Sequence, residues 1–371
     1  MPANPPLQPE PILRPVMPEL DSIRGLAILG VLVYHAFYIQ GSTMAQPGWQ
    51  HLLIVATWPG RLGVNLFFVL SGFLITGILL EAREKESYYK RFYVRRALRI
   101  LPIYIAILII LAIAGYPLSF VVLSFFYLAN FAHLFGITFA YVVIWSLAVE
   151  EHFYLIWPLL VRNLSRINLE RVTIAIIVLS PLVRLVSYRY AAPHDLNWLF
   201  YTWNNADGLA CGAFLALFIR RTKSDRRMLR LASLVACALA AGLWVFGWPF
   251  GIMDRLERPL GAALQIVPFQ FLFFGVLGAF LLIGTTTWKW LVLWRPLRFL
   301  GYISYGLYLT HLLVFNVYDR VFARLHLLTA AQNPMPALII RFVAGGSAAI
   351  LLAWLSRKYF EDPFLRMKPK T

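Results

Sequence analysis

Apolar runs long enough to cross a lipid bilayer recur along almost all of this 371-residue chain. A helix needs about 17–25 apolar residues to cross the hydrocarbon layer. Eleven stretches approach or reach that length: 23–40, 62–81, 99–115, 118–137, 141–161, 171–190, 206–219, 231–249, 264–284, 299–318 and 337–357. Because 60% of the residues are hydrophobic and only 14% are charged, lipid must be the solvent for most of this surface. The sequence therefore predicts an all-α fold, a polytopic transmembrane helix bundle.

Positive charge is concentrated in the short connections between these runs. The formal net charge is +17, and the main basic connections are residues 83–99, 162–171 and 220–230. Lys and Arg beside membrane spans mark cytoplasmic loops, so the charge indicates topology and no nucleic-acid partner is expected. Three runs separate the first two basic loops, where an even number is needed, so one of them is expected to be interfacial, re-entrant or fused with its neighbour. The run 118–137 is the favoured candidate, although the sequence leaves the choice open. This leaves about ten spans, with both termini cytoplasmic.

The chain divides into a short tail and one long domain. Residues 1–18 contain seven prolines and are expected to form a Pro-rich disordered cytoplasmic tail. Residues 19–365 are expected to form a single transmembrane domain, because apolar runs fill this range and no soluble domain interrupts it.

The first span carries ionisable residues, which cost about 2.5–3.5 kcal/mol each in a bilayer and are therefore functional candidates. Arg24 and His35 are eleven residues apart. That spacing is three turns plus roughly 20°, so they share a face about 16 Å apart. Asp21 lies on the same stripe and can pair with Arg24. A neutral His35 can take a proton from a hydroxyl; the alternative is a structural histidine bonded to a neighbouring helix.

Two further polar sets stand at helical spacing. Arg96 and Arg99 share a face at the start of the third run, where they either anchor the helix at the membrane surface or form a guanidinium fork for phosphates. Ser146, Glu150 and Tyr154 are spaced by four residues and lie on one face of the fifth run.

Weaker signals accompany these sets. Small residues in the segment 63–73 favour close helix packing. Asp207 is consistent with a plain helix start, and His311 is a second intramembrane histidine and a reserve base. No His, Asp or Glu set has the spacing of a metal site, so no metal is expected.

In order along the chain, these segments resemble the acyltransferase-3 family of integral membrane acyltransferases. The motifs that carry the resemblance are the Arg-x10-His spacing of Arg24 and His35, the segment Phe67–Ile75, the Arg-x-x-Arg pair of Arg96 and Arg99 with Pro102, and the segment Trp145–Glu151. Two positions depart from the family pattern: Asn65 stands where many members carry Asp, and His152 stands where Gln is commoner.

The resemblance implies an O-acyltransferase that moves an acyl group, by default acetyl, from acyl-CoA to a hydroxyl. The acceptor would be a glycan, a glycolipid or a small polyhydroxylated molecule. His35 would be the essential base, with Arg24 in support. Independently of the resemblance, Glu150 is expected to fix the imidazole tautomer from a neighbouring helix, because a carboxylate is a common partner of a functional histidine. The donor would be engaged by Arg96 and Arg99. Ser146 and Tyr154 are expected to help form the donor site.

Several alternatives remain open from the sequence. A transporter or flippase for a lipid-linked saccharide would also need buried charges and about ten spans, although inverted repeats and broken helices are not evident. Acyl transfer could be direct or pass through a covalent intermediate. The expected location is the cell inner (plasma) membrane, in multi-pass form among membrane lipid. Many family members carry a further C-terminal hydrolase-like domain; this sequence stops soon after Pro363, so a second transfer step is expected to need another protein.

Overall fold

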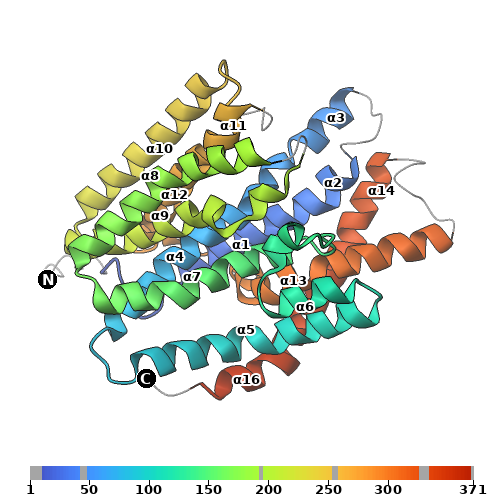
Figure 1. Cartoon of the computed structure of the whole chain (residues 1–371), viewed down its shortest axis with the longest axis horizontal. Coiled ribbons are helices and arrows are strands. Elements are labelled where there is room, and N and C mark those ends of the chain that lie inside the picture. The colour runs from blue at the N-terminus through green and yellow to red at the C-terminus, as the bar shows by residue number, and fades with distance from the viewer. Residues whose placement is uncertain (1–10, 42–47, 192–194, 253–257, 326–333, 369–371) are drawn as a thin grey trace, which may run out of the picture.

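The fold is described from a computed structural model. It describes residues 11–41, 48–191, 195–252, 258–325 and 334–368. Every regular element in these ranges is helical. Figure 1 shows the long helices running side by side in one bundle, with α10 along one edge and α5 and α16 along the other. The all-α expectation is confirmed for the described part of the chain.

Sixteen α-helices are distributed along the described residues. They are α1 (Pro18–Val33), α2 (Ile39–Gly41), α3 (Gly48–Val55), α4 (Gly63–Ala82), α5 (Tyr88–Ile113), α6 (Leu118–Phe125), α7 (Ile144–Asn163), α8 (Arg166–Tyr190), α9 (Thr202–Arg221), α10 (Arg226–Gly247), α11 (Pro259–Leu264), α12 (Val267–Ile283), α13 (Arg295–Arg324), α14 (Pro334–Ile340), α15 (Gly346–Leu355) and α16 (Asp362–Arg366). Three wide π-helical turns join some of them end to end: η1 (Tyr34–Tyr38), η6 (Arg341–Gly345) and η7 (Ser356–Glu361).

Within the described residues, seven continuous helical segments are long and apolar enough to cross a membrane. They are Pro18–Gly41, Gly48–Ala82, Tyr88–Ile113, Arg226–Gly247, Pro259–Ile283, Arg295–Arg324 and Met335–Arg366. The helices α7, α8 and α9 are also 20, 25 and 20 residues long but carry more polar residues. The chain is thus a multi-pass membrane protein, and the number of ten spans stays a prediction.

The run 118–137 does not form one continuous helix. Its first part is α6, which has eight residues, and its second part is the 3-10 segment Ala129–Phe135. Eight residues of α-helix span about 12 Å, well short of the hydrocarbon layer. The run therefore does not form one helix long enough to cross the membrane, and the choice of the run that does not cross stays a prediction.

Two pairs of helices approach closely because glycine removes the side chain at the contact. A Cβ atom on Gly25 of α1 would lie 1.9 Å from a carbonyl oxygen of α13, and one on Gly301 of α13 would lie 1.8 Å from a carbonyl oxygen of α1. The same holds for α4 and α9, where a Cβ atom on Gly72 or Gly212 would meet the opposite backbone at 1.9 and 1.8 Å. The packing role predicted for residues 63–73 is confirmed at Gly72.

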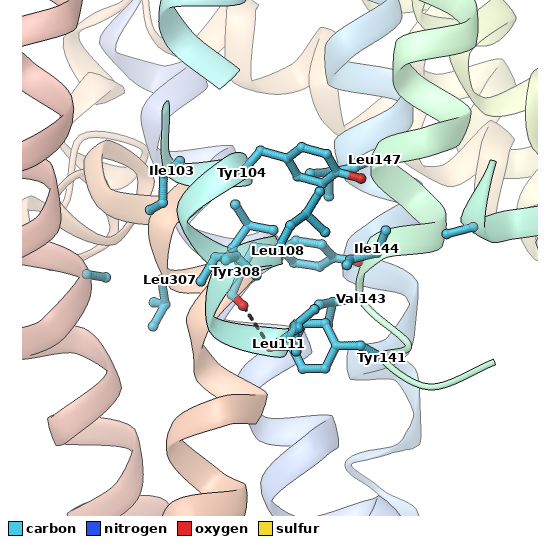
Figure 2. Packing of buried hydrophobic residues seen from close by; sticks show 14 of the residues in the cluster. Ile103, Tyr104, Leu108, Leu111, Tyr141, Val143, Ile144, Leu147, Leu307 and Tyr308 are labelled. Atoms are coloured by element: carbon cyan, nitrogen blue, oxygen red, sulfur yellow. Dashed lines mark hydrogen bonds between the residues drawn. The ribbon is translucent and has the colours of Figure 1, made fainter. Parts of the chain in front are cut away.

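A buried apolar cluster fixes α7 against α5 and α13. Figure 2 shows Tyr104, Leu108 and Leu111 of α5 facing the start of α7 and the side chains of α13. The Tyr141 hydroxyl donates a hydrogen bond of 2.7 Å to the carbonyl oxygen of Leu309. This contact joins the segment just before α7 to α13.

Both described ends of the chain lie at the same end of the bundle. Near the N-terminus, Ile12 is only 1% exposed and Arg14 forms an ion pair with Glu19, so this part of the segment expected to be disordered is packed. Residues 1–10 of that segment lie outside the described residues. Near the C-terminus, Glu361 lines the same small polar pocket as Arg24.

Candidate functional site

A cavity of about 700 Å³ runs between α1, α4, α5, α7 and α13. This volume is in the range of small-molecule and cofactor sites. Its lining residues on α4 extend from Val64 to Ala82, eighteen residues apart, which corresponds to about 27 Å along the helix. Val64 and Phe67 mark the inner end, and Lys85 lies beyond the other end of α4. The cavity therefore follows almost the whole length of one membrane-spanning helix.

Positive charge dominates the cavity lining. Seven basic residues line it, namely Arg24, Lys85, Arg91, Arg95, Arg96, Arg99 and Lys368. The two carboxylates that line it, Glu81 and Glu150, have other partners: Arg220 pairs with Glu81, and the Ser71 hydroxyl donates to Glu150 at 2.7 Å. An anionic ligand is the natural complement of such a surface.

The structure brings six of the seven predicted site residues around this cavity. They are Arg24, Arg96, Arg99, Ser146, Glu150 and Tyr154. The common face predicted for the three α7 residues is thus confirmed, because all three face the cavity. The Arg96 guanidinium lies 4.2 Å from the centre of the Tyr154 ring, a cation–π distance. The Ser146 and Tyr308 hydroxyls share a hydrogen bond of 2.6 Å.

Arg24 belongs to the basic end of the cavity. Its guanidinium forms the predicted ion pair with Asp21, the residue three positions earlier. It lines the cavity and also the small polar pocket shared with Arg99 and Arg357. Among the described residues no contact joins Arg24 to His35, so the support that Arg24 gives to the base stays a prediction.

His35 is the one predicted site residue that does not line the cavity. It lies in the π-helical turn η1, where its Nδ1 is 2.9 Å from the Val31 carbonyl oxygen and 3.3 Å from Nε2 of His311. Tyr308 of α13 does line the cavity, and His311 follows it by one helical turn. The His35–His311 pair therefore lies about one turn beyond the inner end of the cavity.

The hydrogen bonds around the two imidazoles assign their neutral tautomers. Nδ1 of His311 lies 3.1 Å from the Leu307 carbonyl oxygen and 2.8 Å from that of Tyr308. Carbonyl oxygens only accept, so this Nδ1 carries the proton and Nε2 presents a lone pair to His35. Nδ1 of His35 faces the Val31 carbonyl and carries its proton for the same reason. Nε2 of His35 is then unprotonated, and no residue in the described ranges hydrogen-bonds it.

The group that fixes this tautomer differs from the one expected. Glu150 was expected to hold the His35 imidazole, but its carboxylate accepts from Ser71 on α4. The side chain at Nδ1 of His35 is His311, which is fully buried on α13. His311 was considered only as a reserve base. The sequence shows that His311 lies within an apolar run, but it does not show which helix the side chain of His311 faces.

Lys368 is a cavity residue that the sequence did not single out, because nothing in its local pattern distinguishes it from the other basic residues outside the apolar runs. It lies after α16, outside the helical spans, and it lines the cavity. Burial lowers the pKa of Lys368 from 10.5 to about 8, and the positive charges of nearby arginines act in the same direction. Those arginines are Arg99, Arg357, Arg95 and Arg96.

Other buried polar residues lie away from the cavity and hold helices together. Arg184 of α8 forms a 2.9 Å ion pair with Asp207 of α9, so Asp207 is more than the plain helix start suggested by the sequence. Nδ1 of His152 lies 2.7 Å from the Thr202 hydroxyl, which joins α7 to α9. Among the described residues, no group of three or more His, Cys, Asp or Glu side chains is arranged to hold a metal ion.

Comparison with known proteins decides the family. Residues 17–358 match the acyltransferase 3 family model, which is described as an acyltransferase domain. The chain belongs to this family. It therefore carries an acyltransferase domain of this membrane family, and the matched range includes every predicted site residue. No solved structure matches the chain significantly.

Curated relatives are similar to this chain along most of the length of the chain. The peptidoglycan O-acetyltransferase OatA of Listeria monocytogenes is 27% identical over 94% of this chain and 56% of its own length. The putative peptidoglycan O-acetyltransferase YrhL of Bacillus subtilis is 30% identical over 80% of this chain and 48% of its own. A putative O-acetyltransferase of Staphylococcus aureus is 25% identical over 94% and 57%. The chain spans about half the length of the curated relatives that it matches.

Proposed function

We propose that this acyltransferase moves an acetyl group from acetyl-CoA to a hydroxyl of a glycan, with His35 as the general base. The observation that carries the proposal is the cavity, which is basic at one end, apolar along its length and ends about one turn from the His35–His311 pair. The protein would lie in the inner (plasma) membrane of the cell. The basic end of the cavity would face the cytoplasm, which is where acyl-CoA is made. This orientation agrees with the positive-inside distribution of Lys and Arg.

The donor would lie along α4. Its phosphates would meet Arg96 and Arg99, because a guanidinium binds phosphate oxygens with two parallel hydrogen bonds. The pantetheine arm would follow the apolar residues of the lining, such as Leu74 and Ile75. The thioester would then reach the polar inner end at Ser146, which supplies a hydroxyl next to the reacting carbonyl.

The chemistry would use Nε2 of His35. The acceptor hydroxyl gives its proton to this unprotonated nitrogen while its oxygen attacks the thioester carbonyl carbon. The carbon–sulfur bond breaks, and the proton held by His35 passes to the leaving thiolate, which yields an acetyl ester and CoA-SH. His311 would act as a positioning residue by accepting from Nδ1 of His35 and so keeping Nε2 free for the base role.

The acceptor class rests on the relatives. Two of them carry peptidoglycan in their names, which makes the glycan strands of the cell wall the first acceptor to test. A direct test incubates membranes containing the protein with radiolabelled acetyl-CoA and with peptidoglycan fragments or glycolipid extracts. Label in an alkali-labile ester of the glycan supports the proposal. Acetyl-CoA binding without any transfer, across all glycan fractions, would contradict the glycan acceptor.

Lys368 should make donor binding sensitive to pH. Its lowered pKa, about 8, means that it loses its proton between pH 7 and pH 9 and no longer attracts a phosphate. An exposed ion pair contributes roughly 0.2–1 kcal/mol, so the dissociation constant of acetyl-CoA should rise about two- to fivefold over this interval. Isothermal titration calorimetry with acetyl-CoA at pH 7 and pH 9 measures this dissociation constant. A Lys368→Arg variant stays charged and should bind equally at both; an identical rise in this variant would refute the role of Lys368.

The role of His311 can be tested with two amide replacements. In a His311→Gln variant the amide can still accept from Nδ1 of His35, whereas in His311→Asn the shorter side chain cannot reach it. Partners that orient metal-binding histidines typically contribute about 10–100-fold to activity, and we take the same scale for His311. We expect the Asn variant to lose about that much in kcat and the Gln variant clearly less. Equal losses in both variants would show that His311 acts only through packing.

A further inference from the structure

An ion pair between a buried arginine and a partly exposed aspartate lies beside His35, and neither of its residues lines the cavity. Arg341 begins the π-helical turn η6, and its Nε and Nη2 donate to the two carboxylate oxygens of Asp319 at 2.8 and 3.0 Å. The guanidinium carbon of Arg341 lies 4.3 Å from the centre of the Phe315 ring. Its side chain is 6% exposed. A cation held this firmly within a membrane-spanning helix is expected to have a function.

The third nitrogen of this guanidinium reaches the backbone that carries His35. Nη1 of Arg341 donates to the carbonyl oxygen of His35 at 3.0 Å and to that of Ala36 at 3.2 Å. Both carbonyls belong to η1, where the wider turn departs from the regular α-helical hydrogen-bond ladder. Arg341 therefore binds the backbone of the turn that sets the direction of the His35 side chain.

The contacts to His35 converge from one stripe of α13. His311, Phe315 and Asp319 follow one another at intervals of four residues, so they lie on one face of that helix. His311 contacts the His35 imidazole, and Asp319 holds the arginine that contacts the His35 carbonyl. The ring and the backbone of His35 are thus fixed by the same helix through two separate routes.

We propose that Arg341, oriented by Asp319, is a positioning residue for the acyl transfer. It holds the π-helical turn so that Nε2 of His35 points to the acceptor hydroxyl. This inference rests on the proposed function of His35 as the base. It adds two residues from outside the motifs that the sequence singled out. The ion pair alone does not position His35. The hydrogen bonds from Nη1 of Arg341 to the two carbonyl oxygens do so.

A charge-swapped variant separates this role from simple stabilisation. Arg341→Asp combined with Asp319→Arg restores the ion pair but moves the guanidinium onto α13, where it no longer donates to both carbonyls. A displacement of about 1 Å at a catalytic group can cost on the order of 100-fold in rate. We expect kcat to fall by about that factor in the swapped variant. The KM for acetyl-CoA should be unchanged, because neither residue of this pair lines the cavity. Arg341→Lys, which keeps the charge, should give an intermediate loss.

A second readout reports on His35 without any transfer reaction. Diethyl pyrocarbonate modifies an unprotonated imidazole nitrogen, and mass spectrometry of the whole solubilised protein gives the rate at His35. We expect faster modification in both variants, since the turn is no longer held. Arg320→Gln, at the exposed neighbour of Asp319, is the matched control and should change neither readout.

The outcomes distinguish the positioning role of Arg341 from the proposed function of His35 as the base. If kcat and the modification rate of His35 are unchanged in folded Arg341→Lys and in the swapped protein, the positioning role is overturned. Recovery of full kcat in the swapped protein would also overturn it, because the ion pair would then suffice. A third result is that the wild-type protein transfers no acetyl group, while His35 is modified faster in the Arg341 variants than in the wild type. In that case the positioning role stands and the proposed function fails.

Discussion

Replacing His35 with Ala should abolish acetyl transfer while leaving acetyl-CoA binding intact. A general base contributes about 10²–10⁴-fold to rate, so residual activity in the variant should fall by at least two orders of magnitude. Binding should survive because His35 does not line the cavity in which the donor is proposed to lie. The measurement is transfer of radiolabelled acetyl to the glycan fraction, together with acetyl-CoA titration of the same preparation.

The control for this variant is another histidine of the same protein. His51 is exposed on α3 and does not line the cavity, so His51→Ala should transfer acetyl at the wild-type rate. Activity in His35→Ala above about a tenth of wild type would remove His35 as the base. A loss of donor binding in His35→Ala would mean that the inner end of the cavity is not where the thioester lies.

Neutralising Arg96 and Arg99 should produce the largest loss of donor affinity. A hydrogen bond to a charged group contributes about 1.5–3 kcal/mol, and 1.4 kcal/mol corresponds to a tenfold change in affinity. Arg96→Gln and Arg99→Gln should therefore each raise the dissociation constant of acetyl-CoA about 10–100-fold. Titration of the purified variants with acetyl-CoA measures this directly.

A truncated donor shows whether phosphate is the group that these arginines bind. S-acetylpantetheine lacks all three phosphates, so its weaker binding should be the same in wild type and in both variants. Arg166→Gln is the matched control, since Arg166 is exposed at the start of α8 and does not line the cavity. If S-acetylpantetheine and acetyl-CoA lose affinity by equal factors, the arginines support the fold of the cavity rather than the phosphates.

The sequence predicted what depends on local spacing. The long apolar runs predicted an all-helical membrane bundle, and the intervals of four residues in α7 predicted that Ser146, Glu150 and Tyr154 share a face. The pairing of Asp21 with Arg24 followed from the same periodicity. In each case, the residues concerned lie on one helix, so the periodicity of that helix is enough to predict their relative positions.

Contacts between helices were beyond the reach of the same reasoning. Nothing local in Arg341 or His311 reveals that both meet His35, because more than 270 positions separate each of them from it. The π-helical turns have no sequence pattern as clear as apolar periodicity, so the backbone around His35 could not be anticipated. Glu150 was assigned to the wrong partner for the same reason: its helical face was correct, but the helix opposite it was unknown.

The cavity ends at Phe67 and Tyr308, whose ring centres are 6.3 Å apart, and the histidine pair begins about one turn further on. In the proposed reaction this barrier has an electrical consequence. Moving one elementary charge through a membrane potential requires about 2.3 kcal/mol per 100 mV. The phosphates of the donor would stay on the side from which they came. The acetyl group would pass the aromatic rings in one direction and the proton from the acceptor hydroxyl in the other, so the exchange would carry no net charge. Handing the group across the bundle would then be independent of voltage and would open no path for ions.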